Sequence, residues 1–519
     1  MNLPYIDLAV IVLYLLFITI FGSWFVRKNR TGNDFMVAKG SLSSWLIGLS
    51  YFGTYVSSNT FIGVVGRAFG SNWSYFVFSL AIPIAILIST KYFVSYYRKG
   101  GEISSYAHME KRFGTWARIY CVICFLLVEI SRISTITFGM ALALNGLTGW
   151  SLKFIIIVSG IIITLYSLLG GIKAVVWTEA VQSLILFFGA ILLLFFIIEN
   201  VPGGMVNAFR IANENSKFSL GSFRFSFTEE TFWVVFLYGL FMNIKAFGFD
   251  QTYVQRYHTA KSDREARNSL WLGGMLYVPI SLLFFFIGSM LFSYYKTQPE
   301  LLSDLLQKSA VILDKNPVNL TISDVFDQAL PHFMSHGLPP GIAGLIVSAI
   351  MAAAMSTLST CLNSSATILF EDVYKRFFHR NVNDKEALYV LRGATLLVGV
   401  IGTVVAIMMI GVQSILSVWW QLTGIFAGAM LGLFLLGFIV KKADKSAAIT
   451  SVIIGLLVIV WITFSSNIKI LPKFLQSPFH TYMSVVISTL SMFLVGLIYS
   501  HFKSKRQDSI ALLTDKKSE

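Results

Sequence analysis

Long apolar stretches separated by short polar connections dominate the chain. A helix that crosses the hydrocarbon core of a bilayer needs about 20 mostly apolar residues. Thirteen stretches meet this length: 5–26, 44–69, 73–97, 117–147, 152–170, 174–199, 231–255, 268–294, 339–373, 387–411, 413–439, 446–465 and 479–501. The pattern predicts an all-α membrane protein with about 13 transmembrane helices.

The composition agrees with this pattern. Hydrophobic residues make up 55% of the 519 residues and charged residues only 13%, whereas soluble domains are roughly 45–50% apolar and about 25% charged. A soluble enzyme or a disordered chain is therefore disfavoured. Three cysteines are too few for a disulfide framework. We expect Cys121 and Cys124 to be small residues at which neighbouring helices pack.

Lysine and arginine are distributed unevenly over the predicted connections. If the N-terminus lies outside, most of these cations fall on cytoplasmic connections, as the positive-inside rule requires. They include Arg27, Lys28 and Arg30, the group from Arg256 to Arg267, and the tail from Lys503 to Lys517, which we expect to be disordered. We therefore interpret the net charge of +14 as a sign of topology rather than of nucleic-acid binding.

Polar residues interrupt two of the predicted spans. The span 231–255 contains Asn243, Lys245, Gly248 and Asp250, and the span 44–69 contains Gly53-Thr54-Tyr55-Val56-Ser57-Ser58-Asn59-Thr60. Hydroxyl and amide side chains offer the backbone alternative hydrogen-bond partners, which favours unwinding. Unwound backbone at membrane depth is tolerated where it lines a cavity. Close packing through small residues is the alternative.

Paired interrupted spans in equivalent positions are typical of inverted-repeat transporters. We expect two five-helix repeats, in 44–199 and 231–439, separated by an outer loop in 200–230. The second repeat contains an outer insertion at 295–338 that carries short helices. A peripheral first helix and loop occupy 1–43, and two peripheral helices with a tail occupy 440–519. No stretch outside the membrane is large enough for a nucleotide-binding domain. A secondary transporter, a channel, or a membrane enzyme or receptor remains.

The span 339–373 carries a stripe of hydroxyl groups. Ser356, Ser359 and Thr360 are three and four residues apart, so they share one helical face. With unwound carbonyl oxygens of the span 44–69, this face could hold a hard monovalent cation. Helix packing with hydroxyl-to-backbone hydrogen bonds is the alternative.

Two charged residues lie deep within predicted spans. Glu179 needs a proton, a cation or an arginine partner, because a bare carboxylate in hydrocarbon is costly. Arg132 stays charged and can form two hydrogen bonds to a substrate carboxylate. Its alternative role is a structural ion pair with Glu129 or Glu179.

Three blocks of sequence resemble the sodium:solute symporter family: Ser167–Ile172 with Val176–Gln182, Gly341–Ser364, and the interrupted span 44–69. The resemblance implies a LeuT-type 5+5 inverted repeat with peripheral helices, alternating access, and uptake driven by the sodium gradient. Within the family the chain looks most like the bacterial sialic acid symporters. That match rests on Arg132 together with Ser57, Thr60 and Tyr75.

The resemblance also implies site residues. A shared sodium site would use the carbonyl oxygens of Gly53, Val56 and Ala353 and the hydroxyls of Ser356 and Thr357. A possible second sodium would lie near Glu179, Ser356, Ser359 and Thr360, although the relatives carry Asp at the position of Glu179. The substrate-binding candidates are Arg132, Ser57, Thr60, Tyr75, Tyr55, Ser79 and Asn243, where Tyr55 and Ser79 replace the Thr and Gln common in relatives.

These features predict a sodium-coupled symporter that imports a small carboxylated sugar, with sialic acid (N-acetylneuraminic acid) as the substrate and one or two Na⁺ as the co-transported ion. Symport of proline, pantothenate or a neutral sugar is the alternative, and an ion channel is the alternative of another class. The seven histidines lie away from the interrupted segments, so no enzyme activity is expected. We expect a lipid-embedded plasma-membrane protein with its N-terminus outside and its C-terminus cytoplasmic, and with neither nucleic acid nor an obligatory protein partner.

Overall fold

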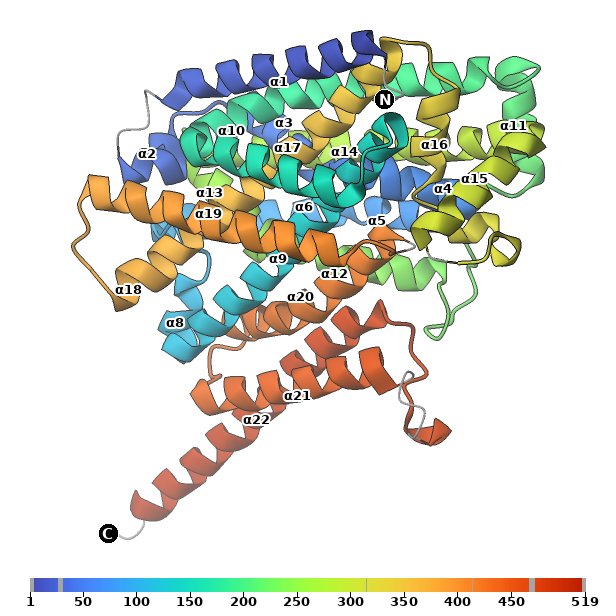
Figure 1. Ribbon diagram of the computed structural model, residues 1–519. Coiled ribbons are helices and arrows are strands. Elements are labelled where there is room, and N and C mark those ends of the chain that lie inside the picture. The colour runs from blue at the N-terminus through green and yellow to red at the C-terminus, as the bar shows by residue number, and fades with distance from the viewer. Residues whose placement is uncertain (1–3, 27–30, 314, 413, 466–471, 516–519) are drawn as a thin grey trace.

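The computed structural model describes residues 4–26, 31–313, 315–412, 414–465 and 472–515, and these residues are almost entirely helical (Figure 1). The predicted first cytoplasmic cations Arg27, Lys28 and Arg30 lie outside the described residues. The chain begins with α1 (Tyr5–Val26) and the short α2 (Gly32–Val37).

The next part of the chain contains the predicted first repeat. Its elements are α3 (Ser44–Tyr55), η2 (Thr60–Val64), α4 (Val65–Gly70), η3 (Trp73–Phe76), α5 (Val77–Leu80), α6 (Ile82–Tyr92), α7 (Val94–Gly100), α8 (Ala107–Phe113), α9 (Thr115–Thr148) and α10 (Leu152–Glu199). The predicted spans 152–170 and 174–199 both fall within α10. The two halves meet at Gly171, whose φ of 53° and ψ of 174° suit a residue without a Cβ atom.

The second half follows the loop helix α11 (Gly204–Glu214). Its elements are α12 (Phe232–Phe249), α13 (Gln251–Thr259), α14 (Asp263–Thr297), α15 (Pro299–Leu313), α16 (Ala329–His336), α17 (Ile342–Ile368), η6 (Leu369–Tyr374), α18 (Lys375–Phe377), α19 (Asp384–Met408) and α20 (Ile415–Ile439). Helices α15 and α16 are the short helices expected in the 295–338 insertion.

Two further helices, α21 (Lys445–Phe464) and α22 (Met483–Asp515), pack against α20 at the lower edge of Figure 1. The expectation that the tail from Lys503 is disordered was wrong for residues 503–515, because α22 continues to Asp515. This stretch contains neither proline nor glycine, the two residues that most readily end a helix.

Eleven helices in the described part of the chain are long and apolar enough to cross a membrane. The two remaining predicted spans correspond to the shorter apolar helices Thr60–Gly70 and Leu152–Leu168. The all-α membrane class is confirmed, and the count of 13 stays a prediction. Cys121 and Cys124 are buried and unpaired on α9, as expected for packing residues.

Both predicted helix interruptions are present. Helix α3 ends at Tyr55, and Val56 is extended with φ −91° and ψ 122°. Helix α12 ends at Phe249, and Asp250 is extended with φ −76° and ψ 124° before α13 begins. The Asp250 side chain accepts a hydrogen bond from the Thr252 amide and so caps α13.

Hydroxyl groups restart the helix after the first interruption. The Thr60 hydroxyl accepts a hydrogen bond from the Ser57 amide at 3.2 Å, and the Ser57 hydroxyl accepts one from the Asn59 amide at 3.2 Å. Helix α9 holds the segment in place, because the Ser58 hydroxyl donates to the Ile136 carbonyl at 2.6 Å. The polar run therefore unwinds for the reason predicted from its side chains.

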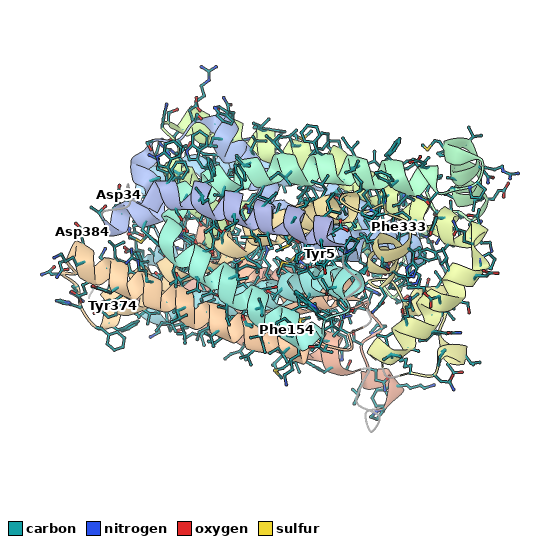
Figure 2. All side chains as sticks on the ribbon, turned by 45° about the horizontal axis from the view of Figure 1, so that its top comes forward. Tyr5, Asp34, Phe154, Phe333, Tyr374 and Asp384 are labelled. Carbon is teal, nitrogen blue, oxygen red and sulfur yellow. The ribbon has the colours of Figure 1, made fainter. Side chains whose placement is uncertain are left out.

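The connections gather at two opposite ends of the helical bundle. In Figure 1, α2, α8 and α18 lie at the left end and α11, α15 and α16 at the right end. Figure 2 shows Asp34, Asp384 and Tyr374 at the first end and Phe333 of α16 at the other. Helix α17 runs between these ends, and most of its residues are buried. Its hydroxyl stripe is thus placed at the centre of the protein.

Candidate functional site

Five predicted sodium ligands come together where the end of α3 meets α17. The Ser356 hydroxyl lies 3.0 Å from the carbonyl oxygens of both Gly53 and Ala353. The Thr357 hydroxyl lies 3.5 Å from the Gly53 carbonyl oxygen, 3.4 Å from that of Val56 and 3.2 Å from that of Ala353. We call this group of oxygens the α3–α17 cage.

The cage holds more acceptors than its protons can satisfy. The Thr357 hydroxyl also lies 3.3 Å from the Thr54 carbonyl oxygen, so its single proton faces four carbonyl oxygens. Ligand oxygens about 2.4 Å from a hard cation are about 3.4 Å apart at neighbouring octahedral positions. The spacings around the Thr357 hydroxyl, 3.2–3.5 Å, are close to that value. The cage oxygens are neutral, which suits a monovalent ion such as Na⁺.

Close approach of α3 to α10 fixes one side of the cage. A Cβ atom on Gly53 would lie 2.5 Å from the Ser183 hydroxyl and 3.2 Å from the Glu179 carbonyl oxygen. A side chain at this position would displace the Ser183 hydroxyl and press on the Glu179 carbonyl group, so Gly53 supplies both a carbonyl ligand and the space that lets α3 approach α10.

Glu179 of α10 lies beside Thr360, one turn along α17 from the cage, and pairs with an arginine. The Nη2 atom of Arg256 lies 2.8 Å and 3.0 Å from the two carboxylate oxygens of Glu179. The same nitrogen donates to the Thr54 hydroxyl at 2.8 Å and to the Thr360 hydroxyl at 2.6 Å. Glu179 also accepts hydrogen bonds from Ser50 and Thr360. A guanidinium nitrogen therefore occupies a nest of four oxygens.

This arrangement bears on the residues predicted for a second sodium. Glu179 and Thr360 are together, but Arg256 lies between their oxygens. The Ser359 hydroxyl donates to the Ser356 carbonyl oxygen at 3.0 Å within α17. Of the three partners that the sequence left open for Glu179, the structure gives it the arginine.

The assignment of Arg256 to a cytoplasmic connection was wrong. Its side chain is 1% exposed, because the residue belongs to α13 and points into the bundle. Residue 256 directly follows the predicted end of a span, and a span boundary cannot show which way a side chain points. Because Arg256 precedes several other cations in the sequence, the sequence shows no sign of its ion pair with Glu179.

A cavity of about 120 Å³ lies beside the interruption in α3. It is lined by six of the seven predicted substrate residues: Tyr55, Ser57, Thr60, Tyr75, Ser79 and Arg132. Asn243 lies behind the wall, where its carbonyl oxygen accepts a hydrogen bond from the Tyr55 hydroxyl. Six of the seven predicted residues therefore line one cavity, and Asn243 lies one layer behind its wall.

Arg132 is oriented by neutral groups. Its Nη2 atom donates to the Thr54 carbonyl oxygen at 2.8 Å and to the Tyr253 hydroxyl at 3.3 Å. The alternative ion pair with Glu129 is present in a loose form, because a Glu129 carboxylate oxygen lies 3.9 Å from Nη1, which is longer than a hydrogen bond. The alternative pairing with Glu179 was wrong, because that carboxylate belongs to Arg256. The remaining N–H groups of Arg132 are well suited to an anion.

The cavity wall includes residues that sequence reasoning missed. The buried ion pair of Lys245 with Asp250 borders it, as do several aromatic residues, among them Tyr238, Tyr253, Tyr277, Trp419 and Trp420. The charged residues in 231–255 gave a signal for the ion pair. Aromatic residues in apolar spans gave none, because a ring that lines a cavity and a ring in the core look alike in sequence.

Comparisons with known proteins agree with this geometry. The model of the sodium:solute symporter family matches residues 35–455. The sodium/sialic acid symporter NanT of Aliivibrio fischeri is 30% identical over 96% of this chain and 94% of its own. The corresponding SiaT of Proteus mirabilis is 31% identical over 90% of this chain and 91% of its own.

A solved structure extends the likeness to three dimensions. A Na⁺-coupled sialic acid symporter in a substrate-bound outward-open state matches with a TM-score of 0.84 and 28% identity, covering 96% of this chain and 98% of the other. Together with the two interrupted helices, this likeness confirms the predicted LeuT-type fold.

Proposed function

The chain belongs to the sodium:solute symporter family, and from this premise we propose that it imports sialic acid (N-acetylneuraminic acid) together with Na⁺ by alternating access. Two sodium/sialic acid symporters are its relatives over at least nine-tenths of its length. Its proposed role is transport without an enzymatic reaction, and both the sugar acid and the ion are cargo.

One observation carries this proposal: a single carbonyl group connects the two candidate sites. The Thr54 carbonyl oxygen accepts a hydrogen bond from Arg132 at 2.8 Å and lies 3.3 Å from the Thr357 hydroxyl. A Na⁺ in the α3–α17 cage orders the turn after α3 and thereby holds Arg132 toward the cavity. Its free N–H groups then bind the substrate carboxylate. By linkage, each cargo raises the affinity for the other.

The cage also gives the ion a part in alternating access. Its ligands come from α3 and α17, so Na⁺ joins two helices that belong to different proposed repeats. Loss of the ion on the low-sodium side removes this bridge and allows the helices to separate. The substrate then leaves because its arginine is no longer held in place.

We propose one Na⁺ per substrate, because Arg256 already neutralises Glu179. Sialic acid carries one negative charge, so one Na⁺ with one substrate moves no net charge. The membrane potential, worth about 2.3 kcal/mol per charge at 100 mV, then contributes nothing. The driving force is the sodium concentration gradient, about 1.4 kcal/mol for each tenfold difference.

We place the protein in the plasma membrane of a cell that has a supply of sialic acid. In the proposed orientation the N-terminus lies outside and the C-terminus lies in the cytoplasm. It rests on the cations near α2, α8 and α18, which the positive-inside rule places in the cytoplasm. The proposed repeats are 44–199 and 231–439, with the 295–338 insertion outside. Lipid surrounds the bundle, and no protein partner is required for this mechanism.

Uptake into proteoliposomes tests the proposal. Labelled N-acetylneuraminic acid should accumulate when an inward Na⁺ gradient is imposed, and it should not when K⁺ replaces Na⁺. Unlabelled proline, pantothenate and a neutral sugar should not compete. An inside-negative potential should leave the initial rate unchanged, whereas a faster rate would indicate a second Na⁺.

Variants of Arg132 locate the carboxylate contact. Arg132→Ala should lower uptake by about 10- to 100-fold, the loss expected for a hydrogen bond to a charged group, and Arg132→Lys should restore part of it. Arg210→Ala is the matched control, because Arg210 lies on the loop helix α11 and bonds only locally to Asn207. Sodium-driven uptake that Arg132→Ala leaves intact would disprove the contact.

A further inference from the structure

A second group of potential cation ligands lies in the 295–338 insertion, at the end of the molecule opposite α2, α8 and α18 (Figure 1). Asp304 projects from α15, and His332 and His336 are one turn apart on α16, the helix that carries the labelled Phe333 in Figure 2. The three residues are remote from the α3–α17 cage. Neither the transport mechanism nor the cavity beside Arg132 uses them.

The three side chains converge on one point. The Nε2 atom of His332 lies 2.7 Å from Asp304 Oδ2, and that of His336 lies 3.8 Å from the same oxygen. The two rings are stacked with centroids 4.3 Å apart. Ligands about 2.0–2.2 Å from a tetrahedral Zn²⁺ are about 3.3–3.6 Å apart. Small side-chain rotations are enough to bring these atoms to such a geometry.

Groups on the far side of each ring suit a proton on Nδ1. The Tyr295 hydroxyl lies 3.0 Å from the Ala329 carbonyl oxygen, to which it can donate, and 2.7 Å from His332 Nδ1, from which it can then accept. His336 Nδ1 lies 2.9 Å from the His332 carbonyl oxygen, which can only accept. With both Nδ1 atoms protonated, both Nε2 atoms present lone pairs, as in metal-binding histidines held by outer partners.

In these tautomers three acceptors face one another, an arrangement that suits a cation. Without a metal, a proton on His332 Nε2 makes its 2.7 Å contact with Asp304 Oδ2 an ordinary hydrogen bond, and a bound metal would replace that proton. Near this point the Lys308 ammonium lies 2.7 Å from Asp304 Oδ2 and 3.3 Å from His336 Nε2.

We propose that Asp304, His332 and His336 bind a transition-metal dication of the Zn²⁺ class, and that Lys308 takes its place when the metal is absent. Two imidazoles with one carboxylate suit Zn²⁺ and leave a fourth position for water. A cavity of about 560 Å³, which Lys308, His332 and His336 help to line, gives the ion access. The bound metal fastens α15 to α16, on the outer face in the proposed orientation.

Metal binding to the full-length protein in detergent, free of any polyhistidine tag and without Na⁺ or sialic acid, tests the site directly. Co²⁺ serves as the spectroscopic probe and Zn²⁺ as the competitor. The wild type should bind one Co²⁺ with the intense visible absorption of a tetrahedral or five-coordinate ion, and Zn²⁺ should abolish that signal. Zn²⁺ should also raise the melting temperature.

Four variants separate ligation from structure. His336→Ala, which removes a partly exposed ligand, should weaken binding by at least about 100-fold, and Tyr295→Phe by about 10-fold, because an outer partner is lost. Lys308→Met should tighten binding by about 10-fold, since the competing ammonium is gone. His379→Ala is the matched control, because His379 contacts a lone carboxylate, Glu386, and should leave binding unchanged.

Either of two results would overturn the proposal: a wild type that shows no Co²⁺ absorption, or a His336→Ala protein that binds as the wild type does. Weaker binding in Lys308→Met would show that the lysine is a structural partner and not a substitute for the metal, which also contradicts it. Because neither transport cargo is present, the outcome is independent of the symport proposal.

Discussion

The proposed sodium position and the guanidinium of Arg256 lie one turn apart along α17, and they differ in the source of the positive charge. The α3–α17 cage consists of neutral oxygens, with the Thr357 hydroxyl close to four carbonyl groups. The neighbouring position contains a carboxylate, Glu179, and a cation that belongs to the protein, Arg256. Thr54 contributes to both, with its carbonyl oxygen in the first and its hydroxyl in the second.

If the cage is the sodium site that we propose, the difference teaches how a protein separates a transported ion from a structural one. Neutral oxygens would attract Na⁺ without holding it by a full opposite charge, so the ion could leave. A buried carboxylate and its guanidinium partner stay together, because separating them leaves an unpaired charge in a medium of low dielectric constant, which costs free energy. We therefore expect the first position to govern coupling and the second to govern the packing of α3, α10, α13 and α17.

The largest expected effect comes from breaking the Glu179–Arg256 pair. Arg256→Met should lower the free energy of unfolding by about 3–5 kcal/mol, because it leaves Glu179 buried without a partner. The double variant Glu179→Gln with Arg256→Met should recover most of this loss. Unfolding in detergent, followed in NaCl and in KCl, measures both. Na⁺ should stabilise the single variant more than the wild type, since it can act as the missing counter-ion.

An exposed ion pair provides the comparison for that measurement. Lys111 and Glu102 form a salt bridge with side chains 65% and 40% exposed. Lys111→Met should change stability by less than about 1 kcal/mol, as is usual for surface pairs. If Arg256→Met is as well tolerated as Lys111→Met, the structural role of the buried pair is wrong.

The next effect concerns the neutral cage. Ser356→Ala or Thr357→Val should raise the Na⁺ concentration for half-maximal uptake by about 10-fold, because one ligand worth about 1.4 kcal/mol is removed. Protein stability should change little. Ser365→Ala is the control on the same helix, since this buried hydroxyl has no hydrogen-bond partner among the described residues. A Na⁺ dependence that neither cage variant alters would reject the cage as the sodium site.

The smallest effect sharpens the contrast between the positions. Ser359→Ala should change Na⁺ activation by less than about twofold, because the Ser359 hydroxyl is bonded to the Ser356 carbonyl within its own helix. Na⁺-dependent uptake measures the change, with Thr357→Val as the positive control. A shift as large as that of Thr357→Val would mean that a second Na⁺ binds beside Glu179 after all.

Local sequence accounts for much of the fold, whereas the resemblance to the family supplied the full set of cage ligands. The spans follow from hydropathy, and the interruptions at Val56 and Asp250 follow from polar groups that compete for the backbone. The hydroxyl stripe on α17 follows from helical periodicity. The number of spans does not follow from local sequence in the same way, because the predicted spans 152–170 and 174–199 form one bent helix, α10, with Gly171 at the bend.

The partners of the buried charges were beyond local reasoning. The position of Glu179 within an apolar span shows that it needs a counter-charge. The sequence of α10 alone does not show whether a proton, an ion or an arginine supplies that charge. Arg256 lies in α13, 77 residues away along the chain, and the sequence placed it among the cytoplasmic cations. Likewise, Asp304 and His332 come from two helices of one insertion, and their meeting depends on how these helices fold together.

The sequence by itself determined that this is a helical membrane protein, where its helices break, and that α17 carries a stripe of hydroxyl groups, because each of these depends on neighbours within one or two turns. The individual cage oxygens were implied by the resemblance to the family. Only the tertiary structure decided which charges meet. An ion pair joins side chains from helices far apart in the chain, and its existence depends on the packing distance and the low dielectric constant that those helices create together.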